Sequence, residues 1–263
     1  MAQRILFEKE DTYSLRGLCM LMIIVHHLYQ WTASRYGVHY PLPASIVLQT
    51  MGNLGSAVFF LLSGYGLSFS LWKKEITAKD SLRRLSKLYL PFVYFWLVGF
   101  IIMMFECQPL SGRLLLGLVT FDLPIVGGGK WFIVSIFVLY ILMIILSKYV
   151  INRKILSMAL FSIVSVYVVL QIFSIHFSQV WYNTIQAFPI GVICAAYKDS
   201  IQCLSSSKGV ALLAMLFVVS FILLQLCGTS HYWPTDKAIY KPLLMNCTCL
   251  FFSMLVVTLI SRD

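Results

Sequence analysis

Long apolar runs alternate with short polar segments along almost the whole chain. Each run is close to the ~20 residues that a helix needs to cross a hydrocarbon core of ~30 Å. A segment in lipid can satisfy its backbone hydrogen bonds internally by forming a helix. The pattern therefore predicts an all-α fold, a polytopic integral membrane helical bundle of about eight transmembrane helices, over residues 15–33, 46–71, 88–105, 131–150, 155–174, 181–197, 209–228 and 242–260.

One further apolar segment, 110–126, is too short for this series. It contains Pro124 and ends at the Gly127-Gly128-Gly129 run, so we expect a re-entrant or interfacial segment rather than a span. The polar stretch 1–11 has no apolar core of the kind that a signal peptide needs, and we expect residues 15–33 to be retained. No repeat or linker divides the chain, which predicts a single membrane domain over residues 1–263.

Composition supports a membrane environment. The chain is 60% hydrophobic and 11% charged, with a mean hydropathy of +0.86, whereas a soluble domain carries roughly 25% charged residues. The net charge of +10 does not indicate nucleic-acid binding, because the basic residues cluster in short segments between apolar runs. The seven cysteines form no CxxC pair or metal-ligand spacing. We expect membrane lipids as partners, no metal site, and cysteines that are mostly small buried hydrophobes.

The distribution of Lys and Arg predicts the orientation of the chain. With the N-terminus inside, fifteen of the 20 basic residues lie on the inner side, and the outer side holds only Arg35, Arg113, Lys130, Lys237 and Lys241. Inner loops of membrane proteins carry this excess of positive charge. The asymmetry predicts that both termini are cytoplasmic.

The first predicted span carries ionisable residues, which are costly in a membrane and therefore candidates for function. Arg16 and His27 are eleven residues apart, or about three helical turns, so they share nearly one face roughly 16 Å apart along the axis. His26 points about 100° away. A histidine on such a face can act as a general base near neutral pH. Alternatively, the arginine extends to the membrane surface and the histidines pack against neighbouring helices.

Two later segments also bear on function. The stretch 52–66 is rich in small residues that let helices approach closely, and Ser63 is better interpreted as a packing position than as a nucleophile. Arg83, Arg84 and Lys87 form the core of the densest basic segment. This segment either only anchors the chain on the inner side, binds anionic lipid headgroups, or binds the phosphates of a nucleotide or coenzyme.

Taken in order, these segments resemble the acyltransferase 3 family of integral membrane acyltransferases. The resemblance is carried by Arg16-Gly17-Leu18-Cys19 with His27, Phe59-Phe60-Leu61-Leu62-Ser63-Gly64-Tyr65, the basic stretch Arg83, Arg84 and Lys87 ending at Pro91, Trp131-Phe132, and Phe188-Pro189-Ile190-Gly191. The chain departs from the family where Cys19 replaces a usual alanine and Lys87 stands near an expected arginine. The family usually has about ten spans, so we expect an acyltransferase-3-like domain that is short at its C-terminal end.

The resemblance implies a membrane O-acyltransferase of the bacterial inner membrane. It would move an acyl group, commonly acetyl, from cytoplasmic acyl-CoA, a co-substrate rather than a bound cofactor, to a hydroxyl of a cell-surface carbohydrate or lipid-linked glycan. His27 would be the general base or the acyl carrier, with Arg16 assisting. The coenzyme phosphates would bind Arg83, Arg84 and Lys87, and the acceptor would contact Lys130 and Trp131.

The alternative is a transporter or flippase of a glycan or lipid precursor without acyl chemistry. An intramembrane His–Arg face and a half-length segment ending in glycines also occur in transporters. A set of aromatic residues either stacks on sugar rings or anchors the chain at the membrane interface: Trp31, Tyr36, Trp181, Tyr182 and Trp233.

Overall fold

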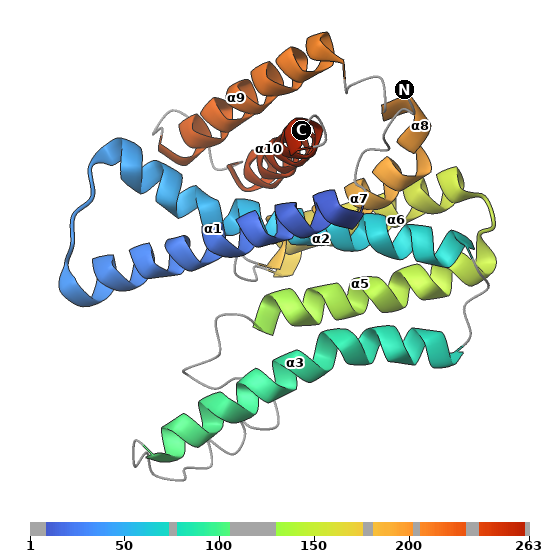
Figure 1. Cartoon of the computed structure of the whole chain (residues 1–263), viewed down its shortest axis with the longest axis horizontal. Coiled ribbons are helices and arrows are strands. Elements are labelled where there is room, and N and C mark those ends of the chain that lie inside the picture. The colour runs from blue at the N-terminus through green and yellow to red at the C-terminus, as the bar shows by residue number, and fades with distance from the viewer. Residues whose placement is uncertain are drawn as a thin grey trace. The chain divides into compact units, whose positions relative to one another are not determined.

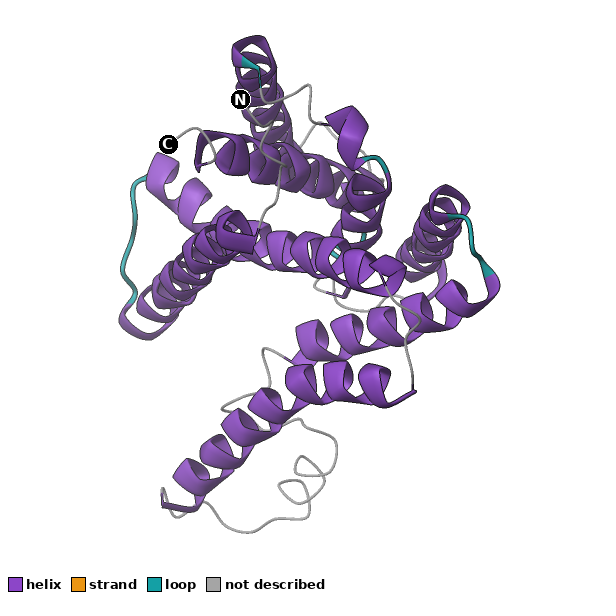
Figure 2. Cartoon of the chain, turned by 45° about the vertical axis from the view of Figure 1, so that its right-hand side comes forward, coloured by secondary structure: helices purple, strands orange, loops and turns teal. Residues whose placement is uncertain are grey.

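The computed structural model describes residues 9–73, 78–105, 130–175, 181–201, 206–229 and 237–260. Within these ranges the chain forms helices and their connecting turns, and no strand (Figures 1 and 2). The predicted all-α fold is confirmed. The predicted re-entrant segment 110–126 lies outside the described residues.

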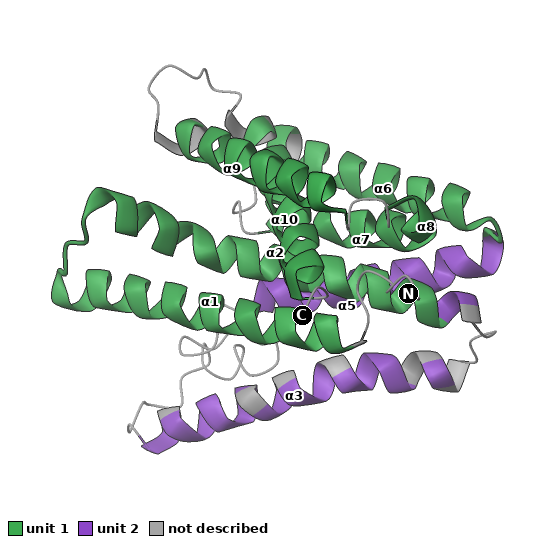
Figure 3. Ribbon diagram, turned by 45° about the horizontal axis from the view of Figure 1, so that its top comes forward, with its two compact units in different colours: residues 1–70, 150–263 green, residues 71–149 purple. Residues whose placement is uncertain are grey.

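The chain divides into two compact units, Met1–Ser70 with Val150–Asp263, and Leu71–Tyr149 (Figure 3). The second unit contains α3 (Ala78–Phe105) and α5 (Lys130–Tyr149), which pack together with the rings of Tyr89 and Phe137 6.2 Å apart. The first unit contains the other elements, with α2 entering it up to Ser70: α1 (Lys9–Tyr36), α2 (Leu42–Lys73), α6 (Arg153–Leu170), the π-helical η2 (Gln171–Ile175), α7 (Ala187–Ala196), α8 (Lys198–Ile201), α9 (Ser207–Thr229) and α10 (Lys237–Ile260).

Six of the described helices are long and apolar enough to cross a membrane, judged by length and composition. They cover six of the eight predicted spans, and they agree with an integral membrane protein. Their apolar segments are Leu42–Trp72, Arg83–Ile102, Lys130–Tyr149, Arg153–Phe173, Ser207–Leu226 and Tyr240–Ile260.

The other two predicted spans differ from this group for different reasons. The first lies in α1, whose 28 residues are long enough, but His26 and His27 lower its apolar character, so its crossing stays a prediction. The span predicted at 181–197 is instead a turn followed by α7, a helix of only 10 residues. Such a helix is about 15 Å long, half of a hydrocarbon core. The count of eight spans and the cytoplasmic termini therefore also stay predictions.

The helices α2 and α7 cross at two glycines. A Cβ atom on Gly64 would overlap the carbonyl oxygen of Phe188, and one on Gly191 would overlap the carbonyl oxygen of Leu61. Each backbone therefore approaches the other at the one residue that has no side chain, as small residues permit between membrane helices. This contact gives the Ser-Gly and Phe-x-x-Gly motifs of the sequence a shared structural role, and it agrees with the interpretation of Ser63-Gly64 as a packing position.

The helix α10 joins the remaining elements of the first unit. It packs against α9, α1 and α7, and the rings of Phe217 and Phe252 lie 5.6 Å apart between α9 and α10. The buried thiol of Cys249 lies near those of Cys19 on α1 and Cys194 on α7. These three cysteines are free and fill the core, as the sequence predicts.

Candidate functional site

Arg16 and His27 lie on one continuous helix, α1, and therefore share a face of it. The stripe of α1 that is buried consists of other residues: Leu15, Cys19, Met22 and His26. Arg16 is half-buried and His27 is exposed, beside this stripe rather than within it. Among the described residues Arg16 forms no ion pair. Neither side chain is thus part of the buried stripe through which α1 packs.

His26 has a different position from its neighbour. Its ring is buried against Gly52 of α2, and its Nδ1 lies 2.8 Å from the carbonyl oxygen of Leu48. A carbonyl oxygen only accepts hydrogen bonds, so Nδ1 carries a proton and donates it. The absence of a side chain at position 52 makes room for the ring. His26 therefore docks α1 on α2, whereas the side chain of His27 is exposed.

This docking makes a prediction about Gly52. A methyl group there would displace the His26 ring and break its bond to Leu48, so Gly52→Ala is expected to destabilise the protein by about 1–3 kcal/mol. Gly17→Ala, which meets no atom within 4 Å, is the matched control. Thermal unfolding of Gly52→Ala, His26→Ala and the double variant measures the coupling. Because the clash needs both groups, the double variant should lose less than the sum of the two single losses; simple additivity would contradict the docking.

Arg83, Arg84 and Lys87 lie within the first turns of α3, so the basic segment is helical and extends the span. Their spacing brings the three cations to adjoining positions over about one turn. Arg83 and Lys87 are exposed and Arg84 is half-buried. Pro91 lies inside the helix and has no N–H, so it cannot donate the usual helical hydrogen bond to the carbonyl of Lys87.

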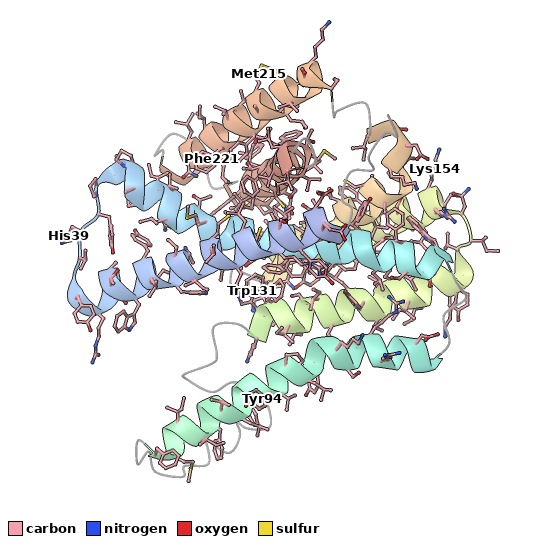
Figure 4. All side chains as sticks on the ribbon, viewed as in Figure 1. His39, Tyr94, Trp131, Lys154, Met215 and Phe221 are labelled. Carbon is pink, nitrogen blue, oxygen red and sulfur yellow. The ribbon has the colours of Figure 1, made fainter. Side chains whose placement is uncertain are left out.

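Lys130 and Trp131 are the first residues of α5. Both are half-buried, and the Trp131 ring meets Phe132 edge to face at 5.9 Å (Figure 4). The structure thus brings Arg16 and His27 together on α1 in one unit. It places Arg83, Arg84, Lys87, Lys130 and Trp131 in the other unit.

The structure adds neutral polar residues that the search for ionisable groups missed. Gln225 of α9 donates a hydrogen bond to Thr50 of α2 at 2.8 Å. Asn246 of α10 donates one to the carbonyl oxygen of Asn183 at 3.0 Å. Amide side chains inside predicted membrane spans are the sequence signal that would have found them, because an amide needs a partner in an apolar environment.

Two lysines of the first unit are held by aromatic rings of other elements. Lys154 Nζ of α6, labelled in Figure 4, lies 5.0 Å from the centre of the Tyr197 ring. Lys198 Nζ lies 5.4 Å from the centre of the Phe69 ring. These distances are typical of cation–π contacts. The sequence pattern had identified these lysines only as part of the inner positive charge.

The aromatic residues considered for sugar stacking divide into two kinds. Trp31 and Tyr36 are exposed at the end of α1, with their rings 5.1 Å apart. Tyr182 is buried, and Trp233 lies outside the described residues. In the part of the chain that the structure describes, no group of three His, Cys, Asp or Glu side chains could hold a metal ion.

Comparison with known proteins bears on the whole chain. The family model described as an acyltransferase domain matches residues 14–263, which include both compact units and the Arg16–His27 segment. Searches of curated proteins and of solved structures gave no match. A family match of this extent, on a fold of membrane-length apolar helices, defines a membrane acyltransferase. The chain belongs to the acyltransferase 3 family.

Proposed function

We propose that the protein transfers an acyl group, in particular acetyl, from cytoplasmic acyl-CoA to a hydroxyl of a cell-surface carbohydrate or lipid-linked glycan, in the bacterial inner membrane. The observation that carries the proposal is the α1 face. It presents Arg16 and the exposed His27 on one continuous helix in a chain of an acyltransferase family.

His27 is the residue assigned to the reacting groups. It accepts the proton of the acceptor hydroxyl while the hydroxyl oxygen attacks the thioester carbonyl carbon, and the carbon–sulfur bond then breaks. The proton passes to the departing coenzyme sulfur, which leaves as a thiol. Attack by the imidazole itself, followed by transfer to the hydroxyl, gives the same products.

Arg16 acts at another point of the same path. About 16 Å of helix axis separates it from His27, too far for both side chains to contact one reacting atom. A cation there suits the donor as it enters, by pairing with a phosphate. Arg16 is therefore a donor-binding residue in this proposal, and His27 is the group that moves the proton.

The cations of α3 are assigned to the coenzyme phosphates. Arg83 and Arg84 can each bind a phosphate through two hydrogen bonds, whereas Lys87 acts as a point charge. For the acceptor we propose Lys130 and Trp131 at the start of α5, where the indole offers an apolar face to a sugar ring.

Neutralising the α3 cations should weaken donor binding and leave the chemical step largely intact. Hydrogen bonds to charged groups contribute about 1.5–3 kcal/mol, so Arg83→Gln, Arg84→Gln and Lys87→Gln are each expected to raise the KM for acetyl-CoA about tenfold or more, with kcat nearly unchanged. Lys208→Gln, which removes an exposed cation at the start of α9, is the matched control. Initial rates of thiol release over a range of donor concentrations measure this, and unchanged KM values in all three variants would remove α3 from the donor site.

The proposed function itself is tested with purified protein in nanodiscs, acetyl-CoA and a membrane glycan extract. Release of free coenzyme thiol that requires both the protein and the extract supports the transferase. Movement of glycan across proteoliposomes without any thiol release would support the transporter alternative instead.

A further inference from the structure

A group of buried side-chain oxygens lies where α10 meets the turn before α7. Asn183, Thr184 and Asn246, which we name the Asn183 cluster, are only 4%, 1% and 2% exposed. The Nδ2 group of Asn246 donates to the carbonyl oxygens of Asn183 at 3.0 Å and of Pro242 at 2.6 Å. These two bonds use both N–H groups of that amide. The bond to Asn183 ties the turn to α10, whereas the bond to Pro242 lies within α10.

Three oxygens of the Asn183 cluster have no hydrogen-bond partner among the described residues. They are Oδ1 of Asn183, Oγ1 of Thr184 and Oδ1 of Asn246. Two buried hydroxyls of α10 are, in contrast, satisfied within their own helix: Thr248 donates to the carbonyl of Leu244, and Ser253 to that of Cys249, both at 2.7 Å. The hydroxyl of Thr184, which has no partner among the described residues, therefore differs from these two buried hydroxyls of the same unit.

The chemistry of the cluster selects its ligand. Two of the three oxygens belong to amides and can only accept hydrogen bonds, and the cluster contains no charged group. Leaving buried acceptors unpaired is costly, more so in apolar surroundings. We propose that the Asn183 cluster binds O–H groups, supplied either by a hydroxyl of the acceptor or by bound water. Binding of a hydroxyl of the acyl-group acceptor rests on the proposed function, whereas binding of water does not.

Replacing Thr184 with valine tests the proposal by the sign of its effect. Valine has nearly the shape of threonine without the hydroxyl. If Oγ1 binds an O–H group, Thr184→Val removes a hydrogen bond and lowers the thermal midpoint in nanodiscs, by about 2–4 °C. If Oγ1 is unpaired, the same change removes a buried unsatisfied group, and the midpoint stays or rises. Thr248→Val is the matched control, since its hydroxyl is satisfied by its own helix.

Two probes separate the sources of the O–H group. The first is methyl glucoside, and the second is its permethylated derivative, which has no hydroxyl. Stabilisation of the wild type by the first probe alone, absent in Thr184→Val, supports an acceptor hydroxyl. A lowered midpoint in Thr184→Val without any probe effect supports bound water. A midpoint of Thr184→Val that is unchanged or raised relative to the wild type overturns the proposal, whatever the probes do.

Protein that does not fold is also informative. If Thr184→Val does not fold, Thr184→Ser decides, because serine keeps the hydroxyl. If Thr184→Ser folds, the result supports the proposal. If neither Thr184→Val nor Thr184→Ser folds, the proposal is overturned, because the site then requires the shape of threonine rather than its hydroxyl. None of these readouts uses acyl transfer. If the protein does not consume acetyl-CoA but Thr184→Val lowers the thermal midpoint as expected, the proposed function is contradicted. The proposal that the Asn183 cluster binds O–H groups is then still supported.

Discussion

Gly64→Ala and Gly191→Ala are each expected to destabilise the protein by about 3 kcal/mol or more. At both positions the added Cβ overlaps a backbone carbonyl oxygen of the facing helix, that of Phe188 or of Leu61. A backbone carbonyl cannot rotate aside as a long side chain can, so α2 and α7 must separate along their contact. The thermal midpoint of the monodisperse fraction, followed by size-exclusion chromatography after heating, should fall by about 6–12 °C.

Gly66 provides the control on the same helix. It lies two residues from Gly64, and a Cβ there meets no atom within 4 Å. Gly66→Ala should therefore leave the midpoint unchanged or raise it slightly, because alanine favours a helix more than glycine does. Equal losses in Gly64→Ala and Gly66→Ala would mean that these glycines set the flexibility of α2 rather than its contact with α7.

His27→Ala is expected to lower kcat by a factor of about 10²–10⁴, the usual contribution of a positioned general base. The His27 side chain is exposed on α1, so its removal should leave the thermal midpoint close to that of the wild type. The rate of thiol release at saturating acetyl-CoA and glycan extract measures the loss. A fall in kcat with an unchanged midpoint separates a chemical role from a structural one.

His39 is the control for the loss of an imidazole. It lies in the loop 37–41 between α1 and α2 and is exposed (Figure 4). His39→Ala should retain the wild-type rate. If His27→Ala also turns over acetyl-CoA at the wild-type rate, His27 is not the proton-transfer group, and the proposed reaction loses its base.

The sequence predicted the helices well where an apolar run was long enough to cross a membrane. Six apolar runs of membrane length became helices of that length. The run at 181–197 was misleading because its average apolar character concealed a turn. Asn183 and Thr184 lie in that turn, and Pro189 then falls in the first turn of α7, where its missing N–H costs no helical hydrogen bond. Average hydropathy does not register such local signals.

Contacts between residues far apart in the chain could not be predicted from the sequence. The small residues around Gly64 indicated a close approach of helices, but nothing near them identified Gly191 as the partner, 127 positions later. The eleven-residue spacing did separate His27 from His26. It could not show that His26 docks on the carbonyl of Leu48. The Asn183 cluster was not predicted, because its members are neutral and only ionisable residues in membrane spans were taken as a sign of function.

The most direct test of the account follows the acyl group to its acceptor. Purified wild-type protein in nanodiscs is incubated with acetyl-CoA labelled in the acetyl group and a membrane glycan extract, and the label in the glycan fraction is counted before and after mild alkali. The account predicts label in the glycan that alkali releases, as an ester should, and initial labelling with His27→Ala that is about 10²-fold or more slower. Label that stays on the coenzyme while the wild-type protein remains folded would contradict it.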